Sequence, residues 1–163
     1  MYFACDPVAL EFVDDAPVRI DRSIELDATP AAVFELFADA ATWPLWFPGI
    51  RRVEWTSPEP KGVGTTRTVV LDVGTVYERF LAWQPGTHFA FRFVGHNRPF
   101  FRFLIEDYRL HDLGSGRARL DYTMAYAPRW PLRIAGRIAR GMFERMCDGA
   151  VAGLAAYVRK SPR

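Results

Sequence analysis

"IELDATPAAVFELFADAATWPLWFPGIRRVEW", residues 24–55, contains the signals for the end of a strand, a short helix and an aromatic turn. It begins inside a segment, residues 18–28, in which apolar and polar residues alternate as they do in a strand with one side toward water. Thr29 is suited to cap a helix, and Pro30 is suited to its first turn. The apolar residues that follow recur at helical spacing, which predicts a short helix ending near Asp39.

An aromatic turn follows this helix. Trp43, Trp46 and Phe47 lie within five residues, and Pro44 and Pro48 exclude any long regular element there. A second short helix and a rigid turn are therefore predicted. Large aromatic side chains are common core anchors, so one interpretation packs these three into the core and the other places them against a ligand.

Beyond the turn, residues 51–128 are nearly all strand and turn signals. Six runs rich in β-branched and aromatic residues are separated by short segments of Gly, Pro, Asn and Asp, and a compact turn lies at 114–116. Six strands with short connections predict an antiparallel meander. With the first strand, the sheet has about seven strands.

The last segment, residues 131–160, changes from strand to helix periodicity and predicts one long amphipathic helix. Its four glycines indicate either room for a neighbour, a kink or tolerated weak points. A curved antiparallel sheet covered by one long helix, with two short helices after the first strand, is a two-layer α+β domain. The apolar helix positions are Ile134, Ile138, Met142, Phe143, Met146, Val151, Leu154, Tyr157 and Val158.

Composition and charge narrow the class of protein. The chain has 163 residues, enough for one domain, and 15% of them are aromatic. Its net charge of +2 gives no reason to expect nucleic acid as a partner. Cys5 and Cys147 are too far apart in sequence for a metal or redox motif. An acidic N-terminus without a basic region and the absence of an 18-residue apolar run predict a cytoplasmic protein.

The sequence resembles the START-like, or SRPBCC, superfamily with the helix-grip fold, especially its polyketide cyclase/dehydrase and lipid-transport branch. The resemblance rests on residues 24–55, on "YRLHDLGSGRARLDYTMAY" at 108–126, and on the long terminal helix. It covers residues 18–159, so residues 1–17 form an N-terminal extension and 18–160 a single ligand-binding domain. The resemblance implies an elongated apolar cavity between sheet and helix, in which members carry lipids, quinones, polyketides or hormones and a minority perform cyclisation or dehydration.

Strand pairing across the turn at 114–116 predicts which side chains face this cavity. A tight turn would pair Tyr108 with Leu120, Glu106 with Tyr122 and Arg102 with Tyr126, all on one face. That face is apolar on the last strand, so Arg102 and Glu106 are also expected to point inward. Buried there, they would orient a polar group of the ligand; at the cavity rim or beyond a bulge, they would be ordinary surface charges.

Phe101, Phe103 and Ile105 alternate with Arg102 and Glu106, so in a regular strand they would face the other side of the sheet. Because they are also apolar, the strand cannot have only one buried face. Either a bulge within 100–106 or a covered outer face resolves the conflict, the cover being the N-terminal extension or a second subunit. An exposed outer face would instead indicate a regulatory protein-interaction module or a homodimer.

The leading interpretation is a non-enzymatic binding or transport module for a hydrophobic small molecule of lipid, isoprenoid or polyketide character. The alternative is a cyclase or dehydrase, in which Arg102 stabilises an enolate-like oxygen and Glu106 or Tyr108 exchanges protons. The candidate ligand-binding residues are Trp43, Trp46, Phe47, Tyr77, Phe91, Arg102, Glu106, Tyr108, Tyr122 and Met142.

No cofactor or metal is predicted, because His88, His96 and His111 lack metal-ligand spacing and no nucleophile motif is present. The start of the terminal helix carries Arg129, Trp130, Arg133 and Arg137, which a solvated face with local salt bridges would explain. Peripheral contact with an anionic membrane is the other explanation.

Overall fold

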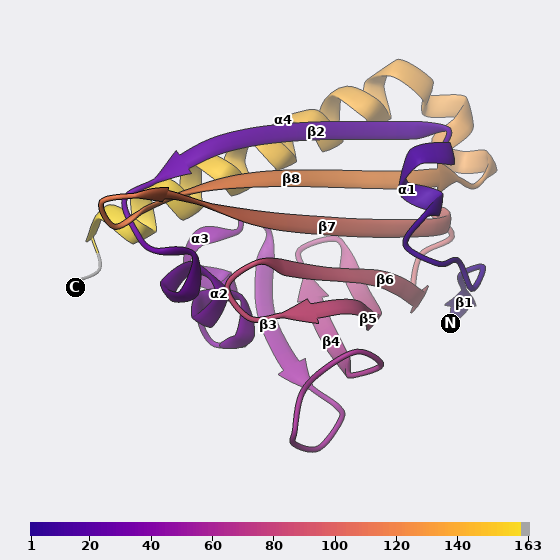
Figure 1. Cartoon of the computed structure of the whole chain (residues 1–163). Coiled ribbons are helices and arrows are strands. Elements are labelled where there is room, and N and C mark those ends of the chain that lie inside the picture. Colours follow the sequence, from indigo (N-terminus) through magenta and orange to yellow (C-terminus); the bar gives the residue numbers. More distant parts are fainter. Residues whose placement is uncertain (161–163) are drawn as a thin grey trace.

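The computed structural model describes residues 1–160. A short strand and a short helix lead into a long strand, two short helices, six more strands and a long C-terminal helix (Figure 1). The elements are β1 (Phe3–Ala4), α1 (Phe12–Asp15), β2 (Val18–Leu26), α2 (Pro30–Ala38), α3 (Trp43–Trp46), β3 (Ile50–Trp55), β4 (Thr66–Leu71), β5 (Gly74–Gln84), β6 (His88–His96), β7 (Phe101–Gly114), β8 (Arg117–Pro128) and α4 (Trp130–Lys160).

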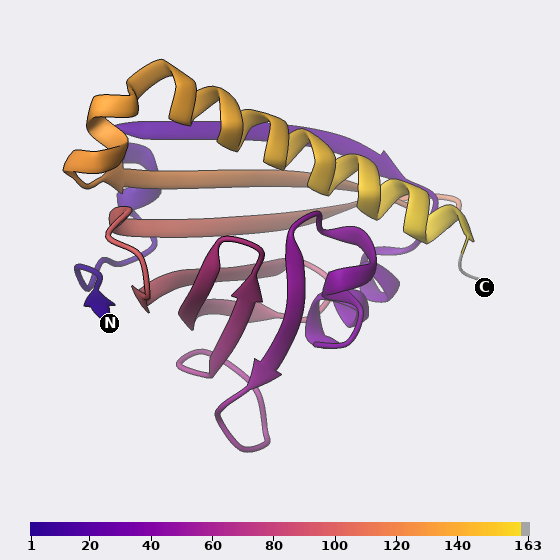
Figure 2. The same ribbon diagram turned by 180° about the vertical axis from the view of Figure 1, so that it is seen from behind.

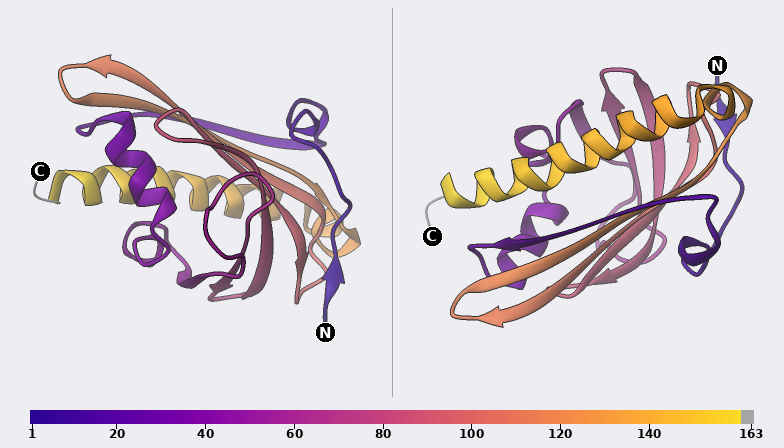
Figure 3. Two further views of the ribbon diagram at one scale, coloured as in Figure 1. Left: turned by 60° about the horizontal axis from the view of Figure 1, so that its bottom comes forward. Right: turned by 90° about the horizontal axis from the view of Figure 1, so that it is seen from above.

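The strands form one curved antiparallel sheet in the order β2-β8-β7-β6-β5-β4-β3, and β1 pairs with β6. The long helix α4 lies along one face of this sheet (Figure 2). The short helices α2 and α3 lie toward the C-terminal end of α4, and α1 lies near the other end of the sheet (Figure 3). This arrangement confirms the predicted two-layer α+β fold of the helix-grip type.

The helix starts predicted in residues 24–55 are present. The Thr29 hydroxyl accepts a hydrogen bond of 3.2 Å from the backbone N–H of Ala32, and Pro30 is the first residue of α2. The aromatic turn forms α3, whose two tryptophans are both buried. Among residues 1–160, no helix combines the length and the apolar character needed to cross a membrane.

The hairpin of β7 and β8 keeps the predicted faces but has a different register. Tyr108 pairs with Tyr122 and not with Leu120, a shift of two residues. Ser115 and Gly116, with φ of 54° and 75°, form the two central positions of the turn, so Gly114 pairs with Arg117, and a bulge between Asp112 and Gly114 then sets the register of the two strands. Since the shift is even, the side chains from Leu104 to Leu110 stay on their predicted faces.

Both explanations for the parity conflict on β7 are realised. The register shifts between Phe101 and Phe103, so Phe101 faces the main core and Phe103 the opposite side. There, Phe103 and Ile105 form a second core with Val8 and Val13 of the N-terminal segment. This chain itself therefore covers the apolar outer face that would have indicated an interaction module.

The helix α4 differs from the prediction in its first half. Gly136, with φ of 44°, interrupts the helical backbone. Beyond this kink, the C-terminal half packs on β2 and α3, and its inward side chains are buried. Ile134 and Ile138, on the apolar face that was predicted for this helix, are 79% and 74% exposed, and Met142, a predicted ligand-binding residue, is 57% exposed.

Candidate functional site

A cavity of about 570 Å³ lies between α4, the inner face of the sheet and the aromatic turn. Its wall is mainly apolar, and the exposed side chains of Val73 and Met142 also line it, which places its mouth between the β4–β5 turn and the first half of α4. Apolar wall residues include Val69, Phe91, Phe93, Leu104, Met124 and Phe143.

A buried ion pair crosses from β4 to β5 in the cavity wall. Arg67 and Glu78 are directly paired across the strands, and Arg67 Nε donates to Glu78 Oε2 at 2.5 Å. The Arg67 guanidinium also lies 4.2 Å from the ring centre of Trp43 and 4.6 Å from that of Phe91. Its Nη1 is buried without a hydrogen-bond partner among the described residues. One donor of a fixed cation is thus left for a ligand.

Glu106 on β7 is the second buried carboxyl of the wall. It is 6% exposed, and its Oε2 accepts hydrogen bonds from the hydroxyls of Tyr108 and of Tyr122, the latter at 3.1 Å. Burial, followed by repulsion from Glu78, raises the pKa of Glu106 to about 7. A carboxyl with this pKa can donate or accept a proton near neutral pH.

His96 provides a third polar position on the wall. It is 2% exposed, and its Nε2 lies 3.1 Å from the carbonyl oxygen of Phe101, which can only accept a hydrogen bond. Burial lowers the pKa of His96, so the ring is neutral with its proton on Nε2. Nδ1 is then an acceptor, and it has no partner in the described part of the chain.

The aromatic turn is divided between the wall and the core. Trp43 and Phe47 line the cavity, and the Trp43 indole N–H donates to the carbonyl of Phe37 at 2.9 Å. Trp46 lies behind them, with its ring centre 4.7 Å from that of Trp43 and 5.9 Å from that of Phe37. Two of the three predicted aromatics therefore face the cavity, and the third holds them in place.

The other predicted site residues separate into three groups. Phe91, Glu106 and Met142 lie on the cavity wall. Tyr108 and Tyr122 lie one layer behind it, where they hold the Glu106 carboxyl.

Arg102 and Tyr77 lie outside the cavity, contrary to expectation. The bulge beside Phe101 turns Arg102 outward, where its side chain is 65% exposed and paired with Asp6 at 2.9 Å. Tyr77 packs against Tyr2 on the outer side of the sheet, because its neighbours Val76 and Glu78 are the residues of β5 that point into the cavity.

Sequence reasoning missed Arg67, Glu78 and His96. For the first two a signal was available in the sequence. Arg67 is two residues before Val69, and Glu78 is two residues after Val76, so each shares a strand face with an apolar residue that lines the cavity. The same rule had found Glu106. For His96 no local pattern points inward.

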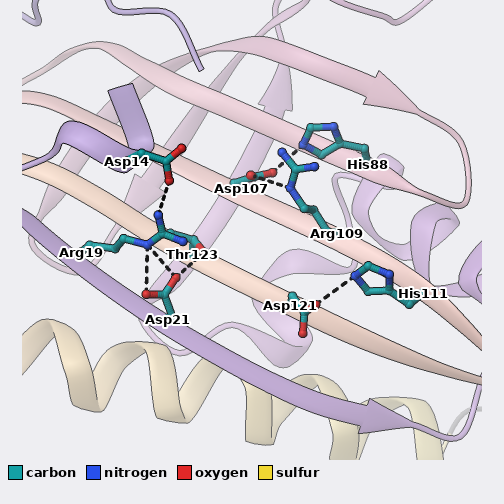
Figure 4. Close-up of polar contacts among 9 residues, drawn as sticks. All are labelled: Asp14, Arg19, Asp21, His88, Asp107, Arg109, His111, Asp121 and Thr123. Carbon is teal, nitrogen blue, oxygen red and sulfur yellow. Dashed lines mark hydrogen bonds and ion pairs between the residues drawn. The ribbon is translucent and has the colours of Figure 1, made fainter. Parts of the chain in front are cut away.

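The outer face carries a separate polar groove of about 760 Å³, where β2, β7 and β8 meet α1 (Figure 4). Most of its charged groups are paired with one another or with neighbouring side chains. Arg19 binds both Asp14 and Asp21, and Asp107 binds His88 at 2.6 Å and Arg109 at 3.0 Å. Since these groups are already paired, the groove offers less to a ligand than the cavity does. Residues 1–160 contain no cluster of His, Cys, Asp and Glu able to hold a metal.

Solved structures with similar folds come from several protein classes. An aromatase/cyclase from a Streptomyces species superposes with a TM-score of 0.72 at 20% identity, over 88% of this chain and 94% of that one. A START superfamily protein from Mycobacterium smegmatis gives a TM-score of 0.74 at 11% identity, over 87% and 97%. At these identities the likeness establishes the fold alone, a curved antiparallel sheet with a long C-terminal helix.

Two comparisons of sequence identify the family. Uncharacterized proteins of Mycobacterium tuberculosis and Mycobacterium bovis are 40% identical over 134 residues, which are 82% of this chain and 80% of theirs. The pattern of the family described as polyketide cyclase/dehydrase and lipid transport matches residues 17–159. The chain therefore belongs to the polyketide cyclase/dehydrase and lipid transport family.

Proposed function

We propose that the protein binds and carries an elongated apolar small molecule, of lipid, isoprenoid or polyketide character, in the cavity between α4 and the sheet. The observation that carries this proposal is the cavity itself, about 570 Å³ with a mainly apolar wall and a few fixed polar groups. This combination is typical of sites for small apolar ligands, in which apolar surface supplies affinity and the polar groups set orientation.

The polar groups predict the chemistry of the ligand. Arg67 Nη1 is an unused donor, which favours a carbonyl, carboxylate or phenolate oxygen near it. Glu106 can donate or accept near the same part of the wall, because its pKa is about 7. His96 Nδ1 is an unused acceptor, which favours a hydroxyl or N–H group. A molecule that is apolar over most of its length with separate oxygen groups meets all three.

The experiment is native mass spectrometry of gently purified protein, with and without added apolar ligands. Wild type should carry an apolar adduct. Ala139→Phe places a ring at a buried position of the α4 cavity wall and should reduce the bound fraction severalfold. Ala152→Phe, at an exposed position of the same helix, is the matched control and should bind as wild type does. Full binding by Ala139→Phe would refute the location of the site.

A second candidate function is proton-transfer chemistry in the same cavity, favoured by two buried groups of its wall, Glu106 and Arg67. The Glu106 carboxylate would remove a proton from the carbon next to a ligand carbonyl, and Arg67 would stabilise the enolate oxygen that receives the electron pair. In a dehydration, the protonated Glu106 would return that proton to the departing hydroxyl as water leaves. With a ligand in hand, Glu106→Gln should abolish turnover and Arg102→Ala, outside the cavity, should preserve it. Equal turnover by both variants would exclude Glu106 as the base, and no turnover by wild type would leave only the carrier.

A further inference from the structure

The first half of α4 carries a row of exposed apolar side chains. Trp130 and Ile134 precede the kink at Gly136, Ile138 and Met142 follow it, and between 57% and 79% of each is exposed. This part of α4 lies at the rim of the molecule, where the chain leaves β8 (Figure 2). An apolar row of this length on a surface helix indicates an interaction site.

The same helix half is strongly basic. Residues 129–143 include four arginines and no aspartate or glutamate. Arg129 binds the backbone carbonyls of Phe101 and Ala4, and Arg140 binds Glu144 at 2.9 Å. Arg133 and Arg137 are exposed, and neither has an ion-pair partner in the described residues. Two cations are therefore free to bind anions beside the apolar row.

This surface is continuous with the mouth of the cavity. Leu132, Ala139 and Phe143 on the same helix half line the cavity, and Met142 belongs both to the exposed row and to the lining. Val73, 62% exposed, lines the opposite side of the mouth. Whatever covers the row also covers the opening through which an apolar molecule would pass.

We propose that the first half of α4 docks on an anionic lipid bilayer, with the apolar row at the boundary between headgroups and acyl chains. Arg133 and Arg137 would bind lipid phosphates, to which the guanidinium is well matched. A tryptophan such as Trp130 is suited to this boundary, where one side is apolar and the other wet. The proposal goes beyond ligand binding and adds the surface across which the cavity exchanges its contents.

A second copy of the chain fits this surface less well. A two-fold interface brings the same patch of both copies together, so the unpaired arginines of one would face those of the other. Because the segment has no carboxylates, nothing in it would neutralise these charges. An anionic surface complements the arginines and accepts the apolar row at once.

The test is co-sedimentation of the full chain with vesicles of phosphatidylcholine, alone or mixed with phosphatidylglycerol. Wild type should bind the anionic vesicles at least about tenfold more tightly than the neutral ones, and high salt should weaken this binding. On binding, the emission of exposed Trp130 should shift to the blue. Vesicle binding needs no ligand, so its failure would leave the proposed function of the cavity standing.

Two pairs of variants separate charge from insertion. Arg133→Glu/Arg137→Glu should lower the affinity for anionic vesicles at least about tenfold. Its control is Arg79→Glu/Arg159→Glu, which changes the charge equally at exposed positions away from the first half of α4. Ile134→Ser/Ile138→Ser, which keeps Trp130 as the fluorescent probe, should abolish insertion and the blue shift. Its control is Leu45→Ser/Val63→Ser, which removes exposed apolar side chains elsewhere.

Three results would overturn the proposal. The first is the same affinity, or none, for both kinds of vesicle in a protein shown to be folded by circular dichroism. The second is an equal loss of binding in the control variants. The third is a dimer in solution that the serine variant converts to a monomer, because this would assign the row to a second copy.

Discussion

Glu106 is a carboxyl whose neighbours make its charge depend on pH near neutrality. The two tyrosine hydroxyls favour its ionised form, but burial and the nearby Glu78 outweigh them and raise its pKa to about 7. The charge of Arg67 opposes this rise. Behind Tyr122, burial raises the pKa of Cys147 to about 12, so that side chain stays a neutral thiol. The protein therefore holds a proton at the cavity wall that an unfolded chain would release.

This proton makes stability depend on pH in a definite direction. The pKa of Glu106 is about 7 in the folded chain and 4.5 in a model peptide, so the folded state binds more protons between these values. Stability should thus fall as pH rises from about 4.5 to 7, by up to roughly 3 kcal/mol, and Glu106 should cause no further loss above that. Glu106→Gln removes the titration and should flatten this part of the profile. Urea unfolding of both proteins across this pH range is the measurement, and parallel profiles would contradict the assignment.

At the residue scale, alternation predicted the inward face of β7 but not every charge on it. Glu106 was found because its parity is shared with apolar neighbours over a regular stretch of strand. Arg102 has the same parity yet lies outside, because the bulge at Phe101 reverses the faces before it. The position of a bulge depends on which side chains the rest of the fold buries, and the strand's own sequence does not contain that information.

At the scale of elements, the glycines of α4 turn out to have three different roles. Gly136 adopts a φ of 44° that places the kink. At Gly153 a Cβ would lie 2.1 Å from the carbonyl oxygen of Trp46, so α4 and α3 touch backbone to backbone. Gly141 contacts nothing closer than the end of Arg145, at 3.7 Å. All three look alike in the sequence.

These contacts predict opposite effects for two identical substitutions. Gly153→Ala should destabilise the protein by about 1–3 kcal/mol, because a main-chain atom of Trp46 must move to admit the methyl group. Gly141→Ala should stabilise it by up to about 1 kcal/mol, since alanine favours the helix and space is available. Thermal and urea unfolding of the two variants beside wild type measure both effects. Equal shifts in the two would show that α4 does not approach the aromatic turn as closely as described.

Helix and strand periods predicted the elements well, because each is a local property of the chain. Thr29 and Pro30 placed the start of α2, and alternation placed the strands. The first half of α4 was assigned an apolar face packed on the sheet, whereas Ile134 and Ile138 are in solvent. Periodicity identifies a row of apolar residues but not the element that covers it. Here the sheet does not cover Ile134 and Ile138.

At the scale of the whole molecule, the N-terminal segment closes the back of the sheet. Val8 and Val13 pack on Phe103 and Ile105, away from the cavity. The backbone of Cys5 also bonds to β6 at Val94, at 3.0 Å, which extends the β1 contact. The fold thus buries both faces of β7 over residues 103–108, one face on the cavity side under α4 and the aromatic turn, the other on the side of residues 1–16.

Removal of residues 1–16 should therefore make the protein associate. The deletion would expose Phe103 and Ile105 as one apolar patch on a flat sheet, and patches of this kind favour self-association. It would also lose the burial of two valines, worth about 3 kcal/mol or more, and lower the melting temperature. Size-exclusion chromatography with light scattering measures the first effect and calorimetry the second.

A point variant covers the case in which the deletion does not fold. Val13→Ser keeps the segment but weakens its hold on the sheet, and should cost about 2 kcal/mol of stability. Glu11→Ser, at an exposed position two residues away, should change neither stability nor mass. If the deleted chain stays monomeric with an unchanged melting temperature, the outer core contributes nothing to the fold. If it associates while still binding apolar ligands, the segment serves to keep the back of the sheet from other molecules, and the cavity works without it.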